Sequence, residues 1–291
     1  MAMDQLNNVL DQAVMGQYSN AHTTLDAGDI GGTANDGIVL STANVADIFT
    51  AQGRTLNSFN RLSPNRFSII GPRMLEKIQL YVGGRETGFG EEVSDNGKVA
   101  KRFGFQLFLS NNLPYTATLT TSATISNGET VVINGVTFTF ATTATSAGDV
   151  DLGSTDAEAT TNLVAAINGT GTPSATTYID ISADERQLLE EAGIAAVDNT
   201  TTISLSGYGD IVVSETMAQA ANVWSAQTQY SLSGINGAIA MITQAAPNVE
   251  FRDAQLRLGK YVHPWTLYGV GVFERMKKNL VATKFDVSDW V

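Results

Sequence analysis

The amino-acid composition of the chain changes at Pro114. The segment 116–230 holds thirteen acidic residues and a single basic one, Arg186, so it carries a formal charge of −12. The rest of the chain has 16 acidic and 16 basic residues and is neutral. A charge divided this unevenly indicates two modules with different surroundings. We therefore predict a core formed by residues 1–115 and 231–291, interrupted by an inserted acidic domain at 116–230.

The bulk composition excludes several classes of protein. The chain of 291 residues is long enough for two domains, each with its own core. It has no cysteine, which excludes disulfides, thiol nucleophiles and cysteine metal sites. No apolar run is long enough to span a bilayer, and the N-terminal stretch MAMDQLNNVLDQAV lacks the basic and apolar regions of a secretory signal. These features predict a cytosolic or assembled protein that does not depend on oxidation.

Hydrophobic spacing and turn residues predict the elements of the core. An apolar residue at every third or fourth position indicates helices at Met3–Tyr18, at Thr42–Asn60, from Pro72 to Gly83 and at Ser231–Ala246. Alternating apolar and polar residues indicate strands at Arg66–Ile70, over the whole stretch Gly97–Pro114, and at Val249–Val262, Trp265–Phe273 and Leu280–Val287. A turn is predicted at His263-Pro264-Trp265, and glycine-rich loops at residues 20–35 and 85–96.

The insert has its own pattern of strands and helices. Asn134-Gly135 between two β-rich runs is the strongest short signal for a hairpin. A helix at Thr155–Asn168 is marked by acidic residues in its first turn and by a glycine after its end. Ser182 and Glu185 form a capping box that begins a second helix. Further strands are predicted at Tyr178–Ile181, Ile203–Leu205 and Ile211–Val213, so the insert is expected to be a small α+β domain.

Residues that could carry catalysis or bind a metal are few and form no known motif. His22 and His263 are far apart in sequence, and a structural role is expected for both. Asp149-x-Asp151-x-Gly153 resembles part of a calcium loop but lacks the third acidic ligand and the closing Glu. The pairs Glu91-Glu92 and Glu190-Glu191 are adjacent in sequence, which directs neighbouring carboxylates to different faces, so solvated surface is expected.

Two glycine pairs and two basic clusters also have structural explanations. Gly207-x-Gly209 and Gly269-x-Gly271 lie in strand or hairpin contexts without the helix start of a phosphate-binding loop, so packing or bend roles are expected. The small basic clusters favour ionic contacts between subunits over phosphate binding; they are Lys98, Lys101 and Arg102, and Arg275, Lys277 and Lys278. We therefore assign no catalytic, cofactor-binding or metal-ligating residue and expect the protein not to be an enzyme.

Three stretches of the core are informative together. They are RLSPNRFSIIGPRMLEKI (Arg61–Ile78), GKVAKRFGFQLFLSNNLP (Gly97–Pro114) and HPWTLYGVGVFERMKKNLVATKF (His263–Phe285). In this order they resemble the major capsid proteins of tailed bacteriophages, which have the Hong Kong 97 phage-like capsid fold. Within the insert, SNGETVVINGVTFTF resembles a module of other phage structural proteins.

The resemblance implies an α+β fold with peripheral and axial domains and a spine helix, for which Met3–Tyr18 is the candidate. Residues 1–115 would supply the spine helix, the peripheral domain and the start of the axial domain, and residues 231–291 the rest. The N-terminal arm and extended hairpin that usually precede the spine helix are expected to be absent, rebuilt or removed, or to lie before the first residue. The acidic insert would be displayed on the outer face of a shell, because its charge repels DNA.

In function, the resemblance implies a structural major capsid protein that self-assembles into the icosahedral head and encloses double-stranded DNA without sequence-specific binding. The expected partners are copies of the chain, as hexamers and pentamers, with cement or decoration, portal and scaffold proteins; no cofactor and no membrane are expected. The expected location is the virion, assembled in the bacterial host cytoplasm, with loops 20–35 and 85–96 at subunit contacts. Two alternatives stay open: a phage tail or head-decoration protein, and a surface adhesive or carbohydrate-acting β-rich protein.

Overall fold

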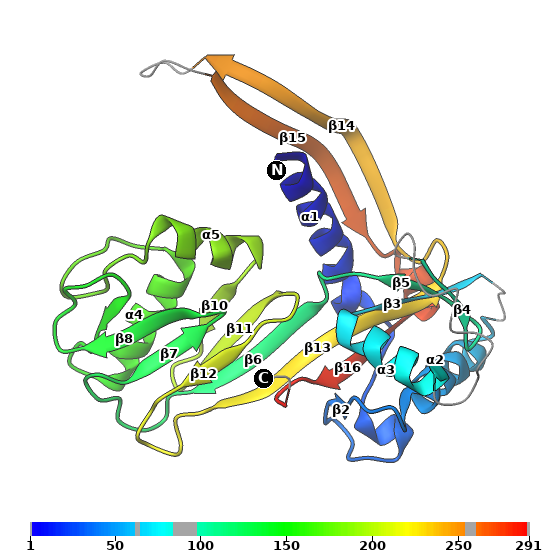
Figure 1. Cartoon of the computed structure of the whole chain (residues 1–291), viewed down its shortest axis with the longest axis horizontal. Helices are drawn as coiled ribbons and strands as arrows, with labels where there is room; N and C mark the ends of the chain where they lie inside the picture. Colours follow the sequence, from blue (N-terminus) through cyan, green and yellow to red (C-terminus); the bar gives the residue numbers. More distant parts are fainter. Residues whose placement is uncertain (1, 62–64, 84–97, 254–259, 290–291) are drawn as a thin grey trace. The chain divides into compact units, whose positions relative to one another are not determined.

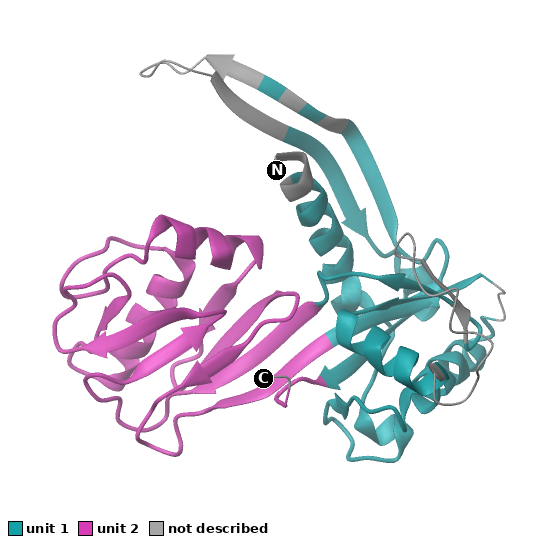
Figure 2. Ribbon diagram, viewed as in Figure 1, with its two compact units in different colours: residues 1–113, 230–285 teal, residues 114–229, 286–291 magenta. Residues whose placement is uncertain are grey.

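The computed structural model describes residues 2–61, 65–83, 98–253 and 260–289 and has a mixed α/β structure (Figure 1). The chain divides into two compact units. Unit 1 consists of residues 1–113 and 230–285, and unit 2 consists of residues 114–229 and 286–291 (Figure 2). Unit 2 thus contains residues 116–229 of the predicted insert, together with residues 114–115 and 286–291, which were predicted to belong to the core, while residue 230 lies in unit 1.

The sheet of unit 1 follows the strand path β13-β3-β5-β4. The bounds of these strands are β13 (Trp224–Ile235), β3 (Arg66–Ile70), β5 (Phe105–Leu109) and β4 (Lys98–Arg102). β3 pairs antiparallel with the end of β13 and parallel with β5, while β4 pairs antiparallel with β5. Two short strands, β1 (Thr23–Leu25) and β2 (Ile38–Val39), pair with β16 (Leu280–Asp286).

Three helices predicted for the core are confirmed. They are α1 (Ala2–Met15), which continues as the 3-10 helix η1 (Gly16–Asn20), α2 (Val45–Ser58) and α3 (Pro72–Gly83). The apolar stripe of α2 is buried, since Ile48, Phe49 and Leu56 are at most 1% exposed. Met74 and Ile78 of α3 are buried as well, so both helices contribute to the core of unit 1.

The prediction of one long strand over Gly97–Pro114 is wrong, because the chain reverses at Phe103-Gly104. Both residues have a positive φ, 50° and 84°, so β4 and β5 form a tight hairpin. This conformation is unfavourable for a bulky residue. Two ring contacts offset its cost: the ring centroid of Phe103 lies 4.9 Å from that of Phe49, in a stacked arrangement, and 5.8 Å from that of Tyr81. Apolar residues continue to alternate through the turn as they do in the strands. The sequence pattern therefore did not indicate the turn.

The predicted helix over Ser231–Ala246 is also wrong. This segment forms the end of β13, a turn at Asn236-Gly237 and the beginning of β14 (Ala240–Asp253). Gly237 has a φ of +87°, a conformation that glycine adopts without steric cost. Leu232 is buried while Ile242 is exposed. The helix-like spacing therefore arose from residues that belong to two different strands.

β14 pairs antiparallel with β15 (Lys260–Gly271), and we call these two strands the arm. The register begins with Ala240 opposite Gly271, and it shifts at two places along the arm. The predicted turn at His263-Pro264-Trp265 is wrong, because these residues lie within β15. α1 lies alongside both strands (Figure 1), so the arm is supported by a helix of its own unit.

Unit 2 contains two strand paths, β10-β11-β6-β13 and β12-β7-β8-β9. The strand bounds are β6 (Pro114–Thr120), β7 (Thr130–Ile133), β8 (Val136–Ala141), β9 (Asp149–Asp151), β10 (Ala195–Asp198), β11 (Thr202–Tyr208) and β12 (Val213–Glu215). The chain enters through β6 and leaves through the first part of β13, and these strands pair antiparallel, with Tyr115 opposite Gln229. Phe138, Phe140 and Leu163 are at most 1% exposed and form part of the core.

The local signals of the insert are largely confirmed. Asn134-Gly135 joins β7 to β8 with both residues at positive φ. Helix α4 (Asp156–Asn168) begins after Thr155, whose side chain accepts from the backbone N–H of Glu158, and ends at a left-handed glycine. Helix α5 (Ala183–Glu191) begins with the capping box of Ser182 and Glu185. The strand predicted at Tyr178–Ile181 is wrong, since only a single bridge joins Tyr178 to Val150.

Gly234 and Gly269 are both strand glycines, and we expect opposite effects from replacing them with alanine. A Cβ at Gly234 would lie 2.4 Å from the carbonyl oxygen of Asn279, so the backbone would have to move, whereas a Cβ at Gly269 would meet no heavy atom within 4 Å apart from its chain neighbours. We expect Gly234→Ala to lower the free energy of unfolding by about 2 kcal/mol. Gly269→Ala should leave it unchanged or raise it by about 0.5 kcal/mol. Urea unfolding followed by circular dichroism measures both values, and equal destabilisation would contradict the expectation.

Candidate assembly surface

One face of the arm carries large apolar side chains that are exposed to solvent. Ile242 on β14 is 67% exposed, and Leu267 and Trp265 on β15 are 52% and 39% exposed. Side chains alternate between the two faces of a strand, and Ile242 stands opposite Gly269, so these three side chains share one face. Exposed apolar clusters of this kind mark interaction sites. We call this surface the apolar face of the arm.

The opposite face of the arm is covered to a greater extent. Thr266, Tyr268 and Val270 alternate with the exposed residues of β15, and all three are partly buried. α1 lies alongside both strands of the arm. Met241 of β14, which stands opposite Val270, is nevertheless 43% exposed. On β15, the apolar face is therefore the more exposed of the two faces.

The apolar face is hollowed where β15 carries Gly269 and Gly271. The hollow has a volume of about 330 Å³, and its other lining residues are apolar: Ala240, Ile242, Val270, Val272 and Phe273. Phe273 itself is 60% exposed at the rim. The hollow thus continues the exposed apolar surface formed by Ile242 and Leu267.

The two glycine pairs singled out in the sequence differ in the structure. A Cβ at Gly207 would lie 2.4 Å from the Cδ1 of Ile211, and Gly209 has a φ of +97°, so the packing and bend roles expected for this pair are confirmed. Gly269 and Gly271 have no positive φ, and a Cβ at either would meet nothing within 4 Å. The expected packing or bend role is therefore wrong for the second pair within this chain.

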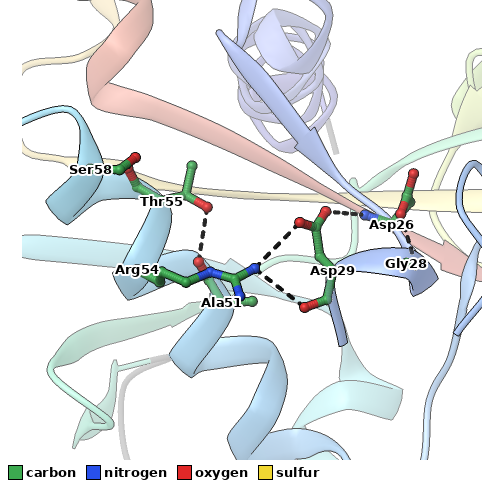
Figure 3. A network of polar contacts seen from close by, with 7 residues as sticks. All are labelled: Asp26, Gly28, Asp29, Ala51, Arg54, Thr55 and Ser58. Atoms are coloured by element: carbon green, nitrogen blue, oxygen red, sulfur yellow. Dashed lines mark hydrogen bonds and ion pairs between the residues drawn. The ribbon is translucent and has the colours of Figure 1, made fainter. Parts of the chain in front are cut away.

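The loop at residues 20–35, expected at subunit contacts, is held by bonds within the chain. It contains the 3-10 helix η2 (Ala27–Ile30), capped by Asp26, whose carboxylate accepts from the backbone N–H groups of Gly28 at 2.8 Å and Asn35 at 2.7 Å. Asp29 accepts from the guanidinium of Arg54 on α2 through its Oδ1 and its carbonyl oxygen, at 3.4 and 3.3 Å (Figure 3). This ion pair is largely exposed and contributes little stability. The role of the loop at residues 20–35 in a subunit contact stays a prediction.

The polar turn at the end of the Gly97–Pro114 stretch fixes α1. Oδ2 of Asp11 on α1 accepts hydrogen bonds from Oγ of Ser110 and Nδ2 of Asn112, both at 2.8 Å. Oγ of Ser110 also accepts from the backbone N–H of Asn112 at 3.1 Å. No pattern in the sequence indicates this cluster, because Asp11 and the turn are far apart in the chain. It holds the helix that supports the arm.

The single basic residue of the insert, Arg186 on α5, is used inside unit 2. Its guanidinium donates to the carbonyl oxygens of Ile167 at 2.6 Å and Ala166 at 2.8 Å, in the last turn of α4. A cation at this position satisfies free carbonyl groups and complements the helix dipole. Asp180 is its one ion-pair partner among the described residues, at 3.4 Å. The one basic residue of the insert is thus bound by the end of α4 and by Asp180, and twelve acidic residues of the segment 116–230 stay in excess.

Among the described side chains, His22 and the two aspartates of the candidate calcium loop each have contacts of their own. The ring of His22 is exposed and lies 4.6 Å from that of Phe59, while His263 lies in β15 with its side chain outside the described residues. Asp149 and Asp151 accept backbone N–H groups of their own loop, including those of Ser146 and Gly153 at 2.8 Å. Within the ranges that the structure describes, no group of three or more His, Cys, Asp or Glu could hold a metal ion.

One basic cluster and one acidic pair lie in described parts of the chain, and the other cluster and pair do not. Arg275, Lys277 and Lys278 lie on the 3-10 helix η4 (Glu274–Asn279), where Lys277 pairs with Glu274 at 2.8 Å. Glu190-Glu191 ends α5 and is exposed, as expected. The side chains of the other basic cluster, in β4, lie outside the described residues, as do Glu91-Glu92 and the loop at 85–96. Ionic contacts between subunits through the basic clusters stay a prediction.

Comparisons with known proteins give no match: no family model matches this chain, and neither does any curated protein. In the part of the chain that the structure describes, no helix has the length and apolar character needed to cross a membrane. The apolar face of the arm must therefore be judged on its own geometry. Hydrophobic spacing in the sequence did not reveal it, because spacing does not show which face of a strand is exposed.

The capping box of α5 should make the free energy of unfolding depend on pH in the acidic range. Hydrogen bonds from the hydroxyl of Ser182, at 2.7 Å, and from its backbone N–H, at 2.9 Å, hold the pKa of Glu185 below its ordinary value. The contribution of the ionised carboxylate is thus present at neutral pH and is lost as the pH falls through this lowered pKa. We expect Glu185→Gln to lower the free energy of unfolding at pH 7 by about 0.5 kcal/mol.

Thermal unfolding followed by circular dichroism, from neutral pH down to acidic pH, measures this dependence. The difference between wild type and Glu185→Gln should shrink as the pH falls, because the wild-type carboxylate becomes protonated. Glu190→Gln, on the same helix and outside the capping box, is the matched control. A difference that stays constant over the whole range would show that the charge of Glu185 does not contribute.

Proposed function

We propose that this protein is the major capsid subunit of a tailed double-stranded DNA bacteriophage, with a Hong Kong 97 phage-like capsid core and an inserted acidic domain. Its function is structural and not enzymatic: copies assemble into the hexamers and pentamers of an icosahedral head. The observation that carries the proposal is the apolar face of the arm, where Ile242, Leu267 and Trp265 are exposed on the part of the chain whose charges nearly balance.

The physical basis of assembly is burial of this face between copies. Full burial of a large apolar side chain contributes roughly 1.5–3 kcal/mol. Association also costs several kcal/mol in lost freedom, so a few such side chains give a weak contact. A subunit that makes several weak contacts assembles cooperatively, and a contact whose rotation closes produces rings. An exposed apolar arm on a charge-balanced unit suits this behaviour.

The order of the three capsid-like stretches supports the same proposal. Arg61–Ile78 contains β3 and the first part of α3, Gly97–Pro114 contains β4 and β5, and His263–Phe285 contains most of β15 and β16. β3 and β5 pair in parallel, so the first two stretches are neighbours in one sheet of unit 1.

The charge of unit 2 supports an outward position for the insert. The segment 116–230 carries −12, and the guanidinium of its one basic residue, Arg186, is engaged by α4. A surface of this charge repels the phosphates of packaged DNA. We therefore propose that unit 2 is displayed on the outside of the shell.

Self-assembly can be tested on the purified chain. We expect it to sediment as capsomers or larger particles and to form rings or closed shells under the electron microscope. Ile242→Asp would bury an unpaired charge in the contact, so the assembled fraction should fall by about tenfold or more.

Val212→Asp is the matched control, because Val212 is also an exposed β-branched residue, 44% exposed, but belongs to unit 2. It should assemble like the wild type. A chain that stays monomeric at every concentration, or that hydrolyses a polysaccharide, would contradict the proposal.

A further inference from the structure

We infer that the hollow of the arm receives large side chains from the arm of a second copy of this chain, in a contact with two-fold symmetry. This inference rests on the proposal that the chain assembles with copies of itself, and it names the residues of one contact. The hollow is the space above Gly269 and Gly271, bordered by Ile242 and Phe273.

Gly269 and Gly271 have no side chains, although nothing in the described part of this chain requires glycine at these two positions. Gly269 and Gly271 have no positive φ, and a Cβ at either would meet no heavy atom within 4 Å. Glycine weakens a strand, and it often marks a place where another backbone or a ligand approaches closely. No described residue of this chain fills that space.

The arm carries the side chains that would fill its own hollow. Along the apolar face of β15, the residues are Trp265, Leu267, Gly269 and Gly271, two large residues followed by two without side chains. When two copies of β15 pack antiparallel about an axis at Tyr268, Leu267 lies over Gly269 of the second copy. Trp265 then lies over Gly271 of that copy. Each arm supplies both the protruding side chains and the hollow, as a two-fold contact requires.

Volume and charge favour this occupant. The hollow measures about 330 Å³. A dry apolar cavity of about 150 Å³ holds a benzene molecule, so the hollow has room for large side chains. Its lining residues are uncharged, and the charges of unit 1 nearly balance, so two copies can approach through their arms. The acidic excess of the chain lies in the segment 116–230, outside the arm.

The first test fills the hollow. Gly269→Leu should fold like the wild type, because the added side chain starts in open space in the single chain, and circular dichroism checks this. We expect the protein concentration needed for half-maximal assembly, measured by sedimentation velocity, to rise about tenfold or more. Ser204→Leu is the control, since Ser204 is an exposed residue of β11 in unit 2. This control should assemble at the wild-type concentration.

The second test detects the contact directly and does not depend on how Gly269→Leu folds. The chain has no cysteine, so every disulfide formed must join introduced residues. Leu267→Cys and Gly269→Cys chains, mixed and oxidised, should form disulfide-linked dimers on a non-reducing gel, as should Trp265→Cys mixed with Gly271→Cys. A mixture of Gly269→Cys with Ser204→Cys should form at least tenfold less dimer.

The outcomes separate this inference from the proposed function. If the wild type forms particles, Gly269→Leu assembles normally and the cysteine mixtures do not cross-link, then the contact is wrong and the capsid proposal stands. If the mixtures cross-link but the wild type forms only dimers, then the contact is right and the capsid proposal fails. If neither particles nor cross-linked dimers form, both are overturned.

Discussion

The pairing of β6 with β13 is the interaction on which the organisation of this chain depends. A chain that leaves one unit to build another must return near its point of departure, and antiparallel neighbouring strands meet this condition directly. Tyr115 on the outgoing strand stands opposite Gln229 on the returning one. β13 then continues into unit 1, where Leu232 stands opposite Ile69 of β3. One strand thus supplies backbone hydrogen bonds to both units, and each unit retains its own core.

The elements that could be predicted from the sequence are those decided by residues close together in the chain. A capping box needs only Ser182 and the residue three positions later, and the hairpin at Asn134-Gly135 needs only two residues that accept a positive φ. The predictions that failed depend on partners far away. Phe103 takes its left-handed conformation in a turn where its ring stacks on Phe49 of α2, and nothing near Phe103 in the sequence shows that contact. Likewise, the residues from Ser231 onward form strands because β3 and β15 are available to pair with them.

The apolar face of the arm could not be predicted from the sequence for a related reason. Alternation along β15 identifies two faces, but it does not show which of them is more exposed in the folded chain. The position of α1 beside the arm was equally hidden, because its hydrogen bonds through Asp11, Ser110 and Asn112 join residues far apart in the sequence. The glycines of β15 were equally ambiguous, because a glycine that is packed and a glycine over open space look the same in sequence. Gly207 and Gly269 illustrate the two cases.

The division of charge bears on how copies of this chain could attract each other. Contacts through the apolar face of the arm would be driven by burial, which salt does not screen, whereas repulsion between acidic units is screened beyond about 10 Å at 0.1 M salt. Contacts through the basic residues of η4, such as Arg275 and Lys278, would be ionic and would weaken with salt. The two sources of attraction therefore predict opposite salt dependences of assembly. The −12 charge of the insert makes the distinction large, because an apolar contact must overcome that repulsion and gains when salt reduces it.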